Sequence, residues 1–155
     1  MCWGLALAQA ARGRAAVDGL ESVVKGYRRA LGPARRGTLR AQTDLASCHV
    51  EAGETGRAVL LYDEVLTRSR GVLGETHAET LAVRELLAGA CRANGNTARG
   101  VPLLEQSLRV RGQVQGDDHP ATLAVAEALA EAYREYGATD KAAALQERVA
   151  RLRRP

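Results

Sequence analysis

Hydrophobic residues in the last third of the chain recur with the period of an α-helix and are interrupted once. One apolar stripe runs from Leu123 to Tyr133, and a second runs from Ala142 to Leu152. Gly137 lies between them, and glycine readily adopts the left-handed conformation that ends a helix. The pattern therefore predicts two helices joined by a short turn.

The same arrangement occurs three times at a spacing of 42 residues. Matching positions include Thr38, Thr80 and Thr122; Leu39, Leu81 and Leu123; Gly53, Gly95 and Gly137; and Thr55, Thr97 and Thr139. In each unit we predict that the glycine ends the first helix and that the following threonine hydroxyl caps the second helix. Residues 32–73, 74–115 and 116–155 are thus predicted to form three helical hairpins.

Residues 1–31 are predicted to form a partial repeat. In the same register, Trp3 aligns with Leu45 and Ala16 aligns with Ala58, so the chain is expected to open inside a helix and to form most of a further hairpin. A hairpin of this kind cannot bury its apolar face alone, which forces neighbouring hairpins to stack. We therefore predict a single all-α domain over residues 1–155, an α-solenoid of antiparallel helix pairs.

Composition supports an all-helical chain. The 155 residues are 46% hydrophobic, with no Phe and one Trp, and the abundance of Ala, Leu and Val favours closely packed helices over a sheet.

The apolar segment at the start of the chain is too short for a membrane span, so we expect a cytoplasmic protein. The spacing of Cys2, Cys48 and Cys91 forms no metal-type pair, so we expect reduced thiols. Cys2 is the predicted reactive thiol, whereas Cys91 is predicted to pack in the core.

The formal net charge is +4, and acidic residues are interspersed along nearly the whole chain. The densest basic stretch contains Arg148, Arg151, Arg153 and Arg154 at the end of the last predicted helix. Cations are favourable at a helix C-terminus, so this stretch is explained by capping. Nucleic-acid binding through it is an alternative that we do not favour.

Small residues at Ala46, Ala88 and Ala130, with Tyr133, Gly137 and Ala142, resemble the tetratricopeptide repeat pattern. The segments "GDDHPATL", "LAEAY" and "VPLLEQSLRVR" are similar to the 42-residue form of kinesin light chains and of many bacterial proteins. The resemblance implies a right-handed superhelix whose concave groove is lined by the first helix of each pair. The paired asparagines of kinesin light chains are absent, so kinesin-type cargo recognition is not expected.

The groove positions of the family transfer to fifteen residues of this chain. They are Arg40, Thr43, Ser47, Val50 and Glu51; Ala82, Glu85, Gly89, Arg92 and Ala93; and Ala124, Glu127, Glu131, Arg134 and Glu135. Glutamates predominate toward the C-terminal end, so the resemblance implies an acidic wall there. A peptide or protein partner with basic residues would gain steering and specificity from such a wall.

Residues that suggest chemistry have structural explanations. His77 and His119 occupy the same place in successive repeats, so we interpret them as residues that organise the turn and not as metal ligands. Cys48 and His49 are adjacent on a predicted helix and point about 100° apart, which disfavours an activated thiolate. The chain carries no phosphate-binding loop or metalloprotease motif, and we predict no catalytic residue, metal or cofactor.

The sequence therefore predicts a non-catalytic protein–protein interaction module for scaffolding or regulation. One alternative is an enzyme or accessory factor whose groove is a small-molecule pocket containing Tyr133, Arg92 or the glutamates. Another is the sensor part of a larger bacterial signal-transduction ATPase or regulator. Apolar surface at the ends of the stack would also allow a homodimer.

Overall fold

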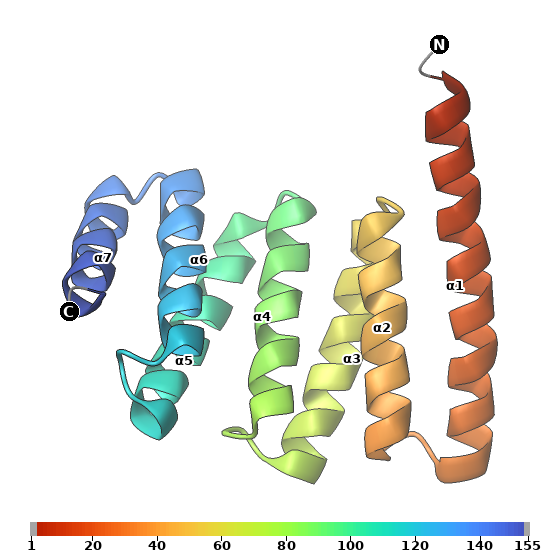
Figure 1. Cartoon of the computed structure of the whole chain (residues 1–155). Helices are drawn as coiled ribbons and strands as arrows, with labels where there is room; N and C mark the ends of the chain where they lie inside the picture. The colour runs from red at the N-terminus through yellow and green to blue at the C-terminus, as the bar shows by residue number, and fades with distance from the viewer. Residues whose placement is uncertain (1–2, 154–155) are drawn as a thin grey trace. The chain divides into compact units, whose positions relative to one another are not determined.

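The computed structural model describes the backbone of residues 3–153 and the side chains of residues 15–153. Seven helices and no strand occur within the backbone range (Figure 1). The chain divides into two compact units, Met1–Leu73 and Gly74–Pro155. The all-α helical repeat predicted from the sequence is confirmed, while the extension of all repeats into one domain stays a prediction.

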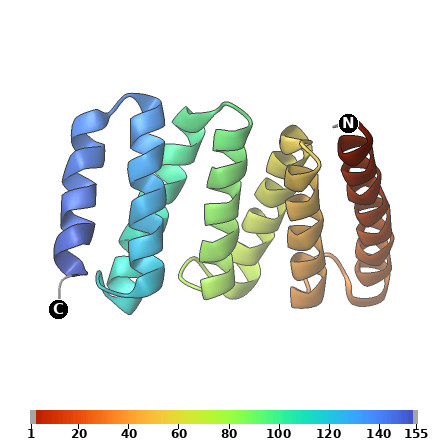
Figure 2. The same ribbon diagram turned by 45° about the horizontal axis from the view of Figure 1, so that its top comes forward.

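The first unit contains α1 (Trp3–Leu31), α2 (Arg36–Glu51) and α3 (Thr55–Leu73). The second contains α4 (Ala78–Ala93), α5 (Thr97–Gln115), α6 (Pro120–Tyr136) and α7 (Thr139–Leu152). Within each unit, helices adjacent in sequence pack against each other, as α6 and α7 do in Figure 2. The three predicted hairpins are therefore the pairs α2–α3, α4–α5 and α6–α7.

The predicted break within residues 1–31 is wrong. Helix α1 is continuous over 29 residues. The position that carries Gly53, Gly95 and Gly137 in the later repeats is Ala11 here, so this segment lacks the residue that adopts positive φ at the helix end. Without that turn signal, the partial repeat forms one helix instead of a hairpin.

Glycines end the first helix of each hairpin, as predicted. Gly53, Gly95 and Gly137 have φ values of +79°, +76° and +85°. The predicted threonine caps are wrong in unit 2, because Thr97 and Thr139 are the first residues of their helices. Asn96 caps α5 instead, where its side-chain oxygen accepts from the Arg99 N–H at 3.2 Å, and the residue at the cap of α7, Ala138, makes no side-chain cap bond.

We expect Gly53→Ala to destabilise unit 1 by about 1 to 2 kcal/mol, because a Cβ is strained in the left-handed region. Gly26 lies within α1 with no neighbouring atom within 4 Å of an added Cβ. Gly26→Ala should therefore stabilise by roughly 0.5 to 1 kcal/mol through its lower unfolded-state entropy. Urea unfolding followed by circular dichroism measures both, and equal effects of the two variants would contradict the turn assignment.

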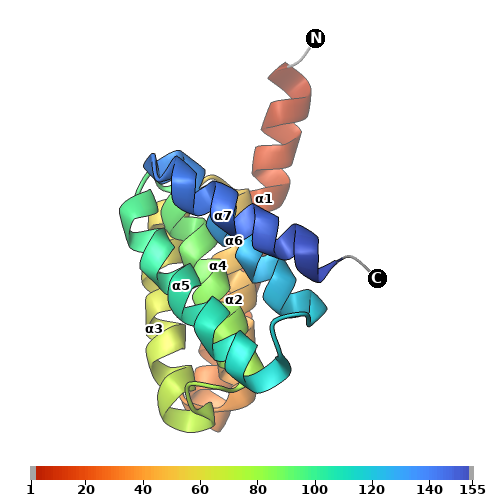
Figure 3. The ribbon, with the colours of Figure 1, turned by 90° about the vertical axis from the view of Figure 1, so that its left-hand side faces the viewer.

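Each unit has an apolar core between its helices. In unit 1, Val17 and Val24 of α1 pack with Ala41 and Leu45 of α2. In unit 2, a cluster joins α4, α5 and α6 through Ala88, Val101, Leu104, Val125, Leu129 and Ala132. Val149 of α7 packs on Leu123 and Ala126 of α6, and Figure 3 shows α7 lying across α6. These contacts fix the relative positions of the helices within each unit.

Two of the cysteines are described. Cys91 is 1% exposed and forms no disulfide with the other described cysteine, which confirms the prediction that it behaves as a small core residue. Cys48 is partly buried, and burial raises the pKa of its thiol, with smaller contributions from Glu51 and Asp44. Cys2, the predicted reactive thiol, lies outside the described residues. None of the described helices is sufficiently long and apolar to cross a membrane.

Candidate functional site: the first-helix face of unit 2

Helices α4 and α6, the first helices of the two hairpins in unit 2, bring three of the predicted groove residues together. Arg92 donates from Nε to Glu135 Oε2 at 2.9 Å and from Nη2 to Glu135 Oε1 at 2.6 Å. Its Nη2 also lies 3.5 Å from Glu131 Oε2. Thr97 donates to Glu135 at 3.5 Å. This cluster joins α4 to α6 and is itself partly exposed.

Glu85, a further predicted groove residue, also forms contacts within its own hairpin. Arg111 of α5 donates from Nε to Glu85 Oε1 at 2.6 Å and from Nη2 to Oε2 at 3.1 Å. Ser107 donates to the same carboxylate at 2.5 Å. The side chains of Arg111 and Glu85 are 9% and 24% exposed, so the pair lies mostly inside unit 2. Glu85 therefore ties the two helices of its hairpin together.

The predicted acidic wall is neutralised within unit 2. Besides the pairs of Glu85, Glu131 and Glu135, Glu127 accepts from Arg153, the residue that follows α7, at 2.7 Å. Every predicted groove glutamate of this unit thus contacts an arginine. The sequence placed the glutamates on the first helices but could not show that Arg111 of α5 and Arg153, directly after α7, reach them.

A small pocket of about 160 Å³ lies between α4 and α6. Its lining residues are Glu85, Gly89, Arg92, Leu104, Ala124, Val125 and Ala128. Four of them, Glu85, Gly89, Arg92 and Ala124, were predicted as groove positions. Small residues leave the space open, and an added Cβ at Gly89 would meet no neighbouring atom within 4 Å. The pocket offers room for one side chain of a bound segment.

The predicted groove residues of unit 1 all lie on α2. Arg40 and Glu51 are exposed, whereas Thr43, Ser47 and Val50 are partly buried. Ser47 Oγ shares a hydrogen bond of 2.7 Å with Tyr62 of α3, and Thr43 donates to the Leu39 carbonyl at 2.9 Å. The hydroxyl groups of this face are therefore engaged within unit 1.

The contact between Arg92 and Glu135 has an electrostatic consequence. Its hydrogen bonds hold the pKa of Glu135 below the ordinary value and raise the pKa of Arg92. A depressed carboxyl pKa contributes stability that is present above the unfolded-state pKa and is lost as the pH falls through the folded-state pKa. The α4–α6 link is thus expected to weaken in acid and to stay intact at neutral pH.

We expect Arg92→Met to raise the pKa of Glu135 toward its ordinary value, because the hydrogen-bond donors are removed. Carboxyl ¹³C NMR titration measures this shift. Arg134→Met is the matched control, since Arg134 is exposed and no described residue pairs with it. A Glu135 pKa that is the same in the native chain and in Arg92→Met would show that the bidentate contact does not form.

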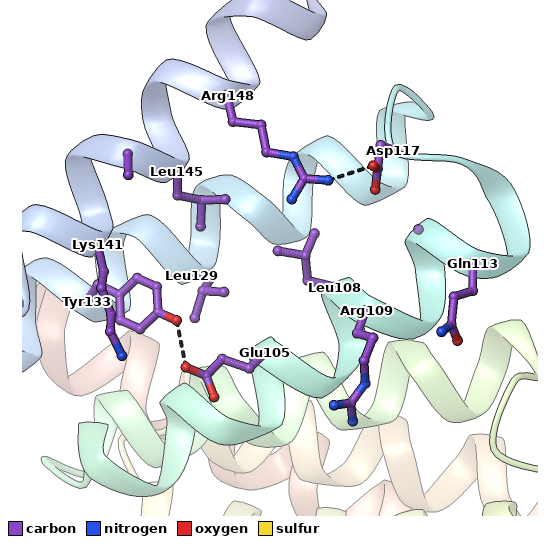
Figure 4. Close-up of a pocket in the computed structure, with 12 residues that line it drawn as sticks. Glu105, Leu108, Arg109, Gln113, Asp117, Leu129, Tyr133, Lys141, Leu145 and Arg148 are labelled. Carbon is purple, nitrogen blue, oxygen red and sulfur yellow. Dashed lines mark hydrogen bonds and ion pairs between the residues drawn. The ribbon is translucent and has the colours of Figure 1, made fainter.

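A second, larger cleft of about 750 Å³ lies between α5 and α7 (Figure 4). Leu108, Leu129 and Leu145 line its middle, and Tyr133 donates to Glu105 at 2.6 Å at one end. Burial and this hydrogen bond raise the pKa of Tyr133 to about 12. The alternative in which the groove is a small-molecule pocket places Tyr133 beside Arg92, whereas Tyr133 lines the α5–α7 cleft and Arg92 lines the α4–α6 pocket.

The histidines and the basic C-terminal stretch have structural roles. His77 and His119 are the N-caps of α4 and α6, where Nδ1 accepts from the N–H of Glu79 and Ala121, which confirms the predicted turn role. Within the described range, no three His, Cys, Asp or Glu side chains are arranged to hold a metal ion.

In the basic C-terminal stretch, Arg148 pairs with Asp117 at 2.6 Å, and Arg151 lies 4.0 Å from Glu147. Arg154 lies outside the described residues.

Comparison with known proteins agrees with this geometry. Two family models described as tetratricopeptide repeat match residues 38–79 and 78–154. A crystal structure from Podosopora anserina, described as putative kinesin light chain nearly identical TPR-like repeats, is 32% identical with a TM-score of 0.84. The match covers 91% of this chain and 67% of that one. A search of curated proteins finds no match.

A more distant structure shows the same fold. BtubC (BKLC) from P. vanneervenii has a TM-score of 0.83 at 22% identity, and the match covers 92% of this chain but 57% of that chain. The chain therefore spans somewhat more than half the length of BtubC. The three hairpins agree with the family models and with the 32% identity to the Podosopora anserina repeats. The chain belongs to the tetratricopeptide repeat family.

Proposed function

We propose that the chain binds a peptide or protein segment on the α4–α6 face of unit 2 and thereby scaffolds or regulates a partner in the cytoplasm. Tetratricopeptide repeats are generally protein–protein interaction modules and are typically non-catalytic. The observation that supports this face is the pocket of about 160 Å³ between the two first helices, with charged residues beside it. A bound segment would place one side chain in the pocket.

The charges beside the pocket set the chemistry of that segment. Glu131 and Glu135 are 58% and 46% exposed at the side chain, so a partner can reach them, but both already contact Arg92. A basic residue of the partner must therefore compete with Arg92 for them. We infer that an aliphatic side chain in the pocket supplies most of the affinity and that a basic residue contributes to orientation.

A steric block tests this site. Peptides selected from a random display library on the full chain supply the ligand, and fluorescence anisotropy measures their affinity. Gly89→Leu should fill the pocket and weaken binding at least tenfold without loss of helicity, because leucine is a better helix former than glycine. Gly26→Leu on α1 is the control, since space is also free there. Equal binding by both variants would exclude the pocket.

The α5–α7 cleft supports a second candidate, a small-molecule site. Its volume of about 750 Å³ is within the range of ligand clefts, and apolar residues line its middle. Arg109 and Lys141 line the cleft without a carboxylate partner among the described residues, which favours an aliphatic ligand with one anionic group. Decanoate is the probe for this cleft. Saturable binding of decanoate that is weakened by Lys141→Gln would support this candidate. Equal binding of decanol, which carries no charge, would exclude a role for the anionic group.

A further inference from the structure

Helix α6 packs on one face of the α4–α5 hairpin, and the positions that form this face have equivalents in the other repeats. Leu104 of this face packs with Val125, Leu129 and Ala132 of α6. Arg92, at its edge, reaches the Ala128 carbonyl at 3.5 Å as well as Glu131 and Glu135. The occupant of the face is thus a helix that presents an apolar stripe and two glutamates four residues apart.

The same face recurs on the α6–α7 hairpin. A hollow of about 580 Å³ is lined by Glu127, Glu131, Arg134, Gln146, Val149, Ala150 and Arg153, which we call the end face. A shift of 42 residues places these positions on Glu85, Gly89, Arg92, Leu104, Ser107, Leu108 and Arg111. The end face is therefore the repeat equivalent of the surface that holds α6.

One feature of the end face is arranged as it is under α6, and a second lacks only its partner. Arg153 contacts Glu127 at 2.7 Å, as Arg111 contacts Glu85 at 2.6 Å at the equivalent positions. Arg134 stands where Arg92 stands, but it is exposed, and it pairs with no carboxylate within the described part of the chain. The cation that holds the two glutamates of α6 thus has an unpaired counterpart at the end face.

We propose that the end face binds an amphipathic helix of a partner protein with the chemistry of α6. This helix carries apolar residues at the positions of Val125, Leu129 and Ala132 and glutamates at the positions of Glu131 and Glu135. Arg134 forms the bidentate contact with these glutamates. The inference does not depend on the peptide pocket between α4 and α6.

Two substitutions make the end face more polar than its counterpart. Glu131 replaces Gly89, and Gln146 replaces Leu104. Less apolar surface is available to a docked helix, so its binding is weaker than the packing of α6 and is reversible. The charged contact at Arg134 consequently sets the specificity of the site.

A helix-stapled peptide with the sequence of residues 120–136 is the probe, because this segment occupies the equivalent face. It should bind the full chain saturably in fluorescence anisotropy. Arg134→Glu should weaken it on the order of tenfold, since attraction is replaced by repulsion. A peptide with Glu131→Arg and Glu135→Arg should bind Arg134→Glu more tightly than it binds the unaltered chain. Arg134 is exposed, so the variant is expected to fold.

The variant Arg92→Glu distinguishes two ways in which the peptide could bind: docking at the end face, or displacement of α6 from its own place on the α4–α5 hairpin. Under the proposal, the peptide binds Arg92→Glu as well as it binds the unaltered chain. If Arg92→Glu abolishes binding and Arg134→Glu does not, the peptide has displaced α6 and the proposal is wrong. Absence of saturable binding, or equal affinity of the peptide and its charge-swapped form for both chains, also overturns it.

Discussion

Leu129→Ala is expected to lower the free energy of unfolding by about 2 to 5 kcal/mol, because truncation removes apolar contacts and leaves a cavity. Leu129 is 2% exposed and packs in the cluster that joins α4, α5 and α6. A single hairpin of unit 2 cannot bury its apolar stripe on its own, so the loss of stability at Leu129 affects both hairpins. Urea unfolding followed by circular dichroism measures the effect.

Leu60→Ala is the matched control for Leu129→Ala. Leu60 lies on α3 and is 71% exposed, so the same truncation should change stability by no more than about 0.5 kcal/mol. A loss at Leu129 as small as that at Leu60 would mean that the hairpins of unit 2 do not share a core. The repeat architecture would then not explain stability.

Glu85→Ala is expected to destabilise unit 2 by about 3 kcal/mol, because it leaves the Arg111 guanidinium mostly buried without its counter-charge. The loss should be greater than that of an ordinary surface ion pair, since Arg111 is 9% exposed at the side chain. The double variant Glu85→Ala with Arg111→Met should recover much of the loss, because no unpaired charge remains. Equilibrium unfolding of the single and double variants measures this difference.

The repeat supplies an internal control for Glu85→Ala. Glu127 and Arg153 form the equivalent pair in the next hairpin, but their side chains are 46% and 54% exposed. Glu127→Ala should therefore cost less than about 1 kcal/mol. Equal losses at Glu85 and Glu127 would show that burial does not distinguish the two pairs.

The helices and turns of the repeats were predictable because each depends on local sequence. The apolar period defines the helices, and Gly53, Gly95 and Gly137 mark the turns at which a positive φ is required. The same reasoning explains the error at α1, where only the register of the repeat supported a break. Ala11 stands in place of the turn glycine, so the local signal was absent.

The neutralisation of the glutamates was not predictable from the helices that carry them. Arg111 follows Glu85 by 26 positions, and Glu135 follows Arg92 by 43. Contacts at such separations depend on how neighbouring helices pack and not on the periodicity of one helix. The resemblance to the family indicated which helix face could contact a partner, but the charge of that face depends on which residues of neighbouring helices pair with the glutamates, including Arg92 of α4 and Arg111 of α5.

The most direct test of the α4–α6 face as the binding surface is to map where a selected peptide contacts the chain. Amide chemical shifts of the ¹⁵N-labelled full chain are followed during titration with a display-selected peptide. We predict that the largest saturable changes occur at Gly89, Arg92, Ala124 and Ala128, around the α4–α6 pocket. Changes confined to α5 and α7, with none at these four residues, would contradict the assignment of this face as the binding surface.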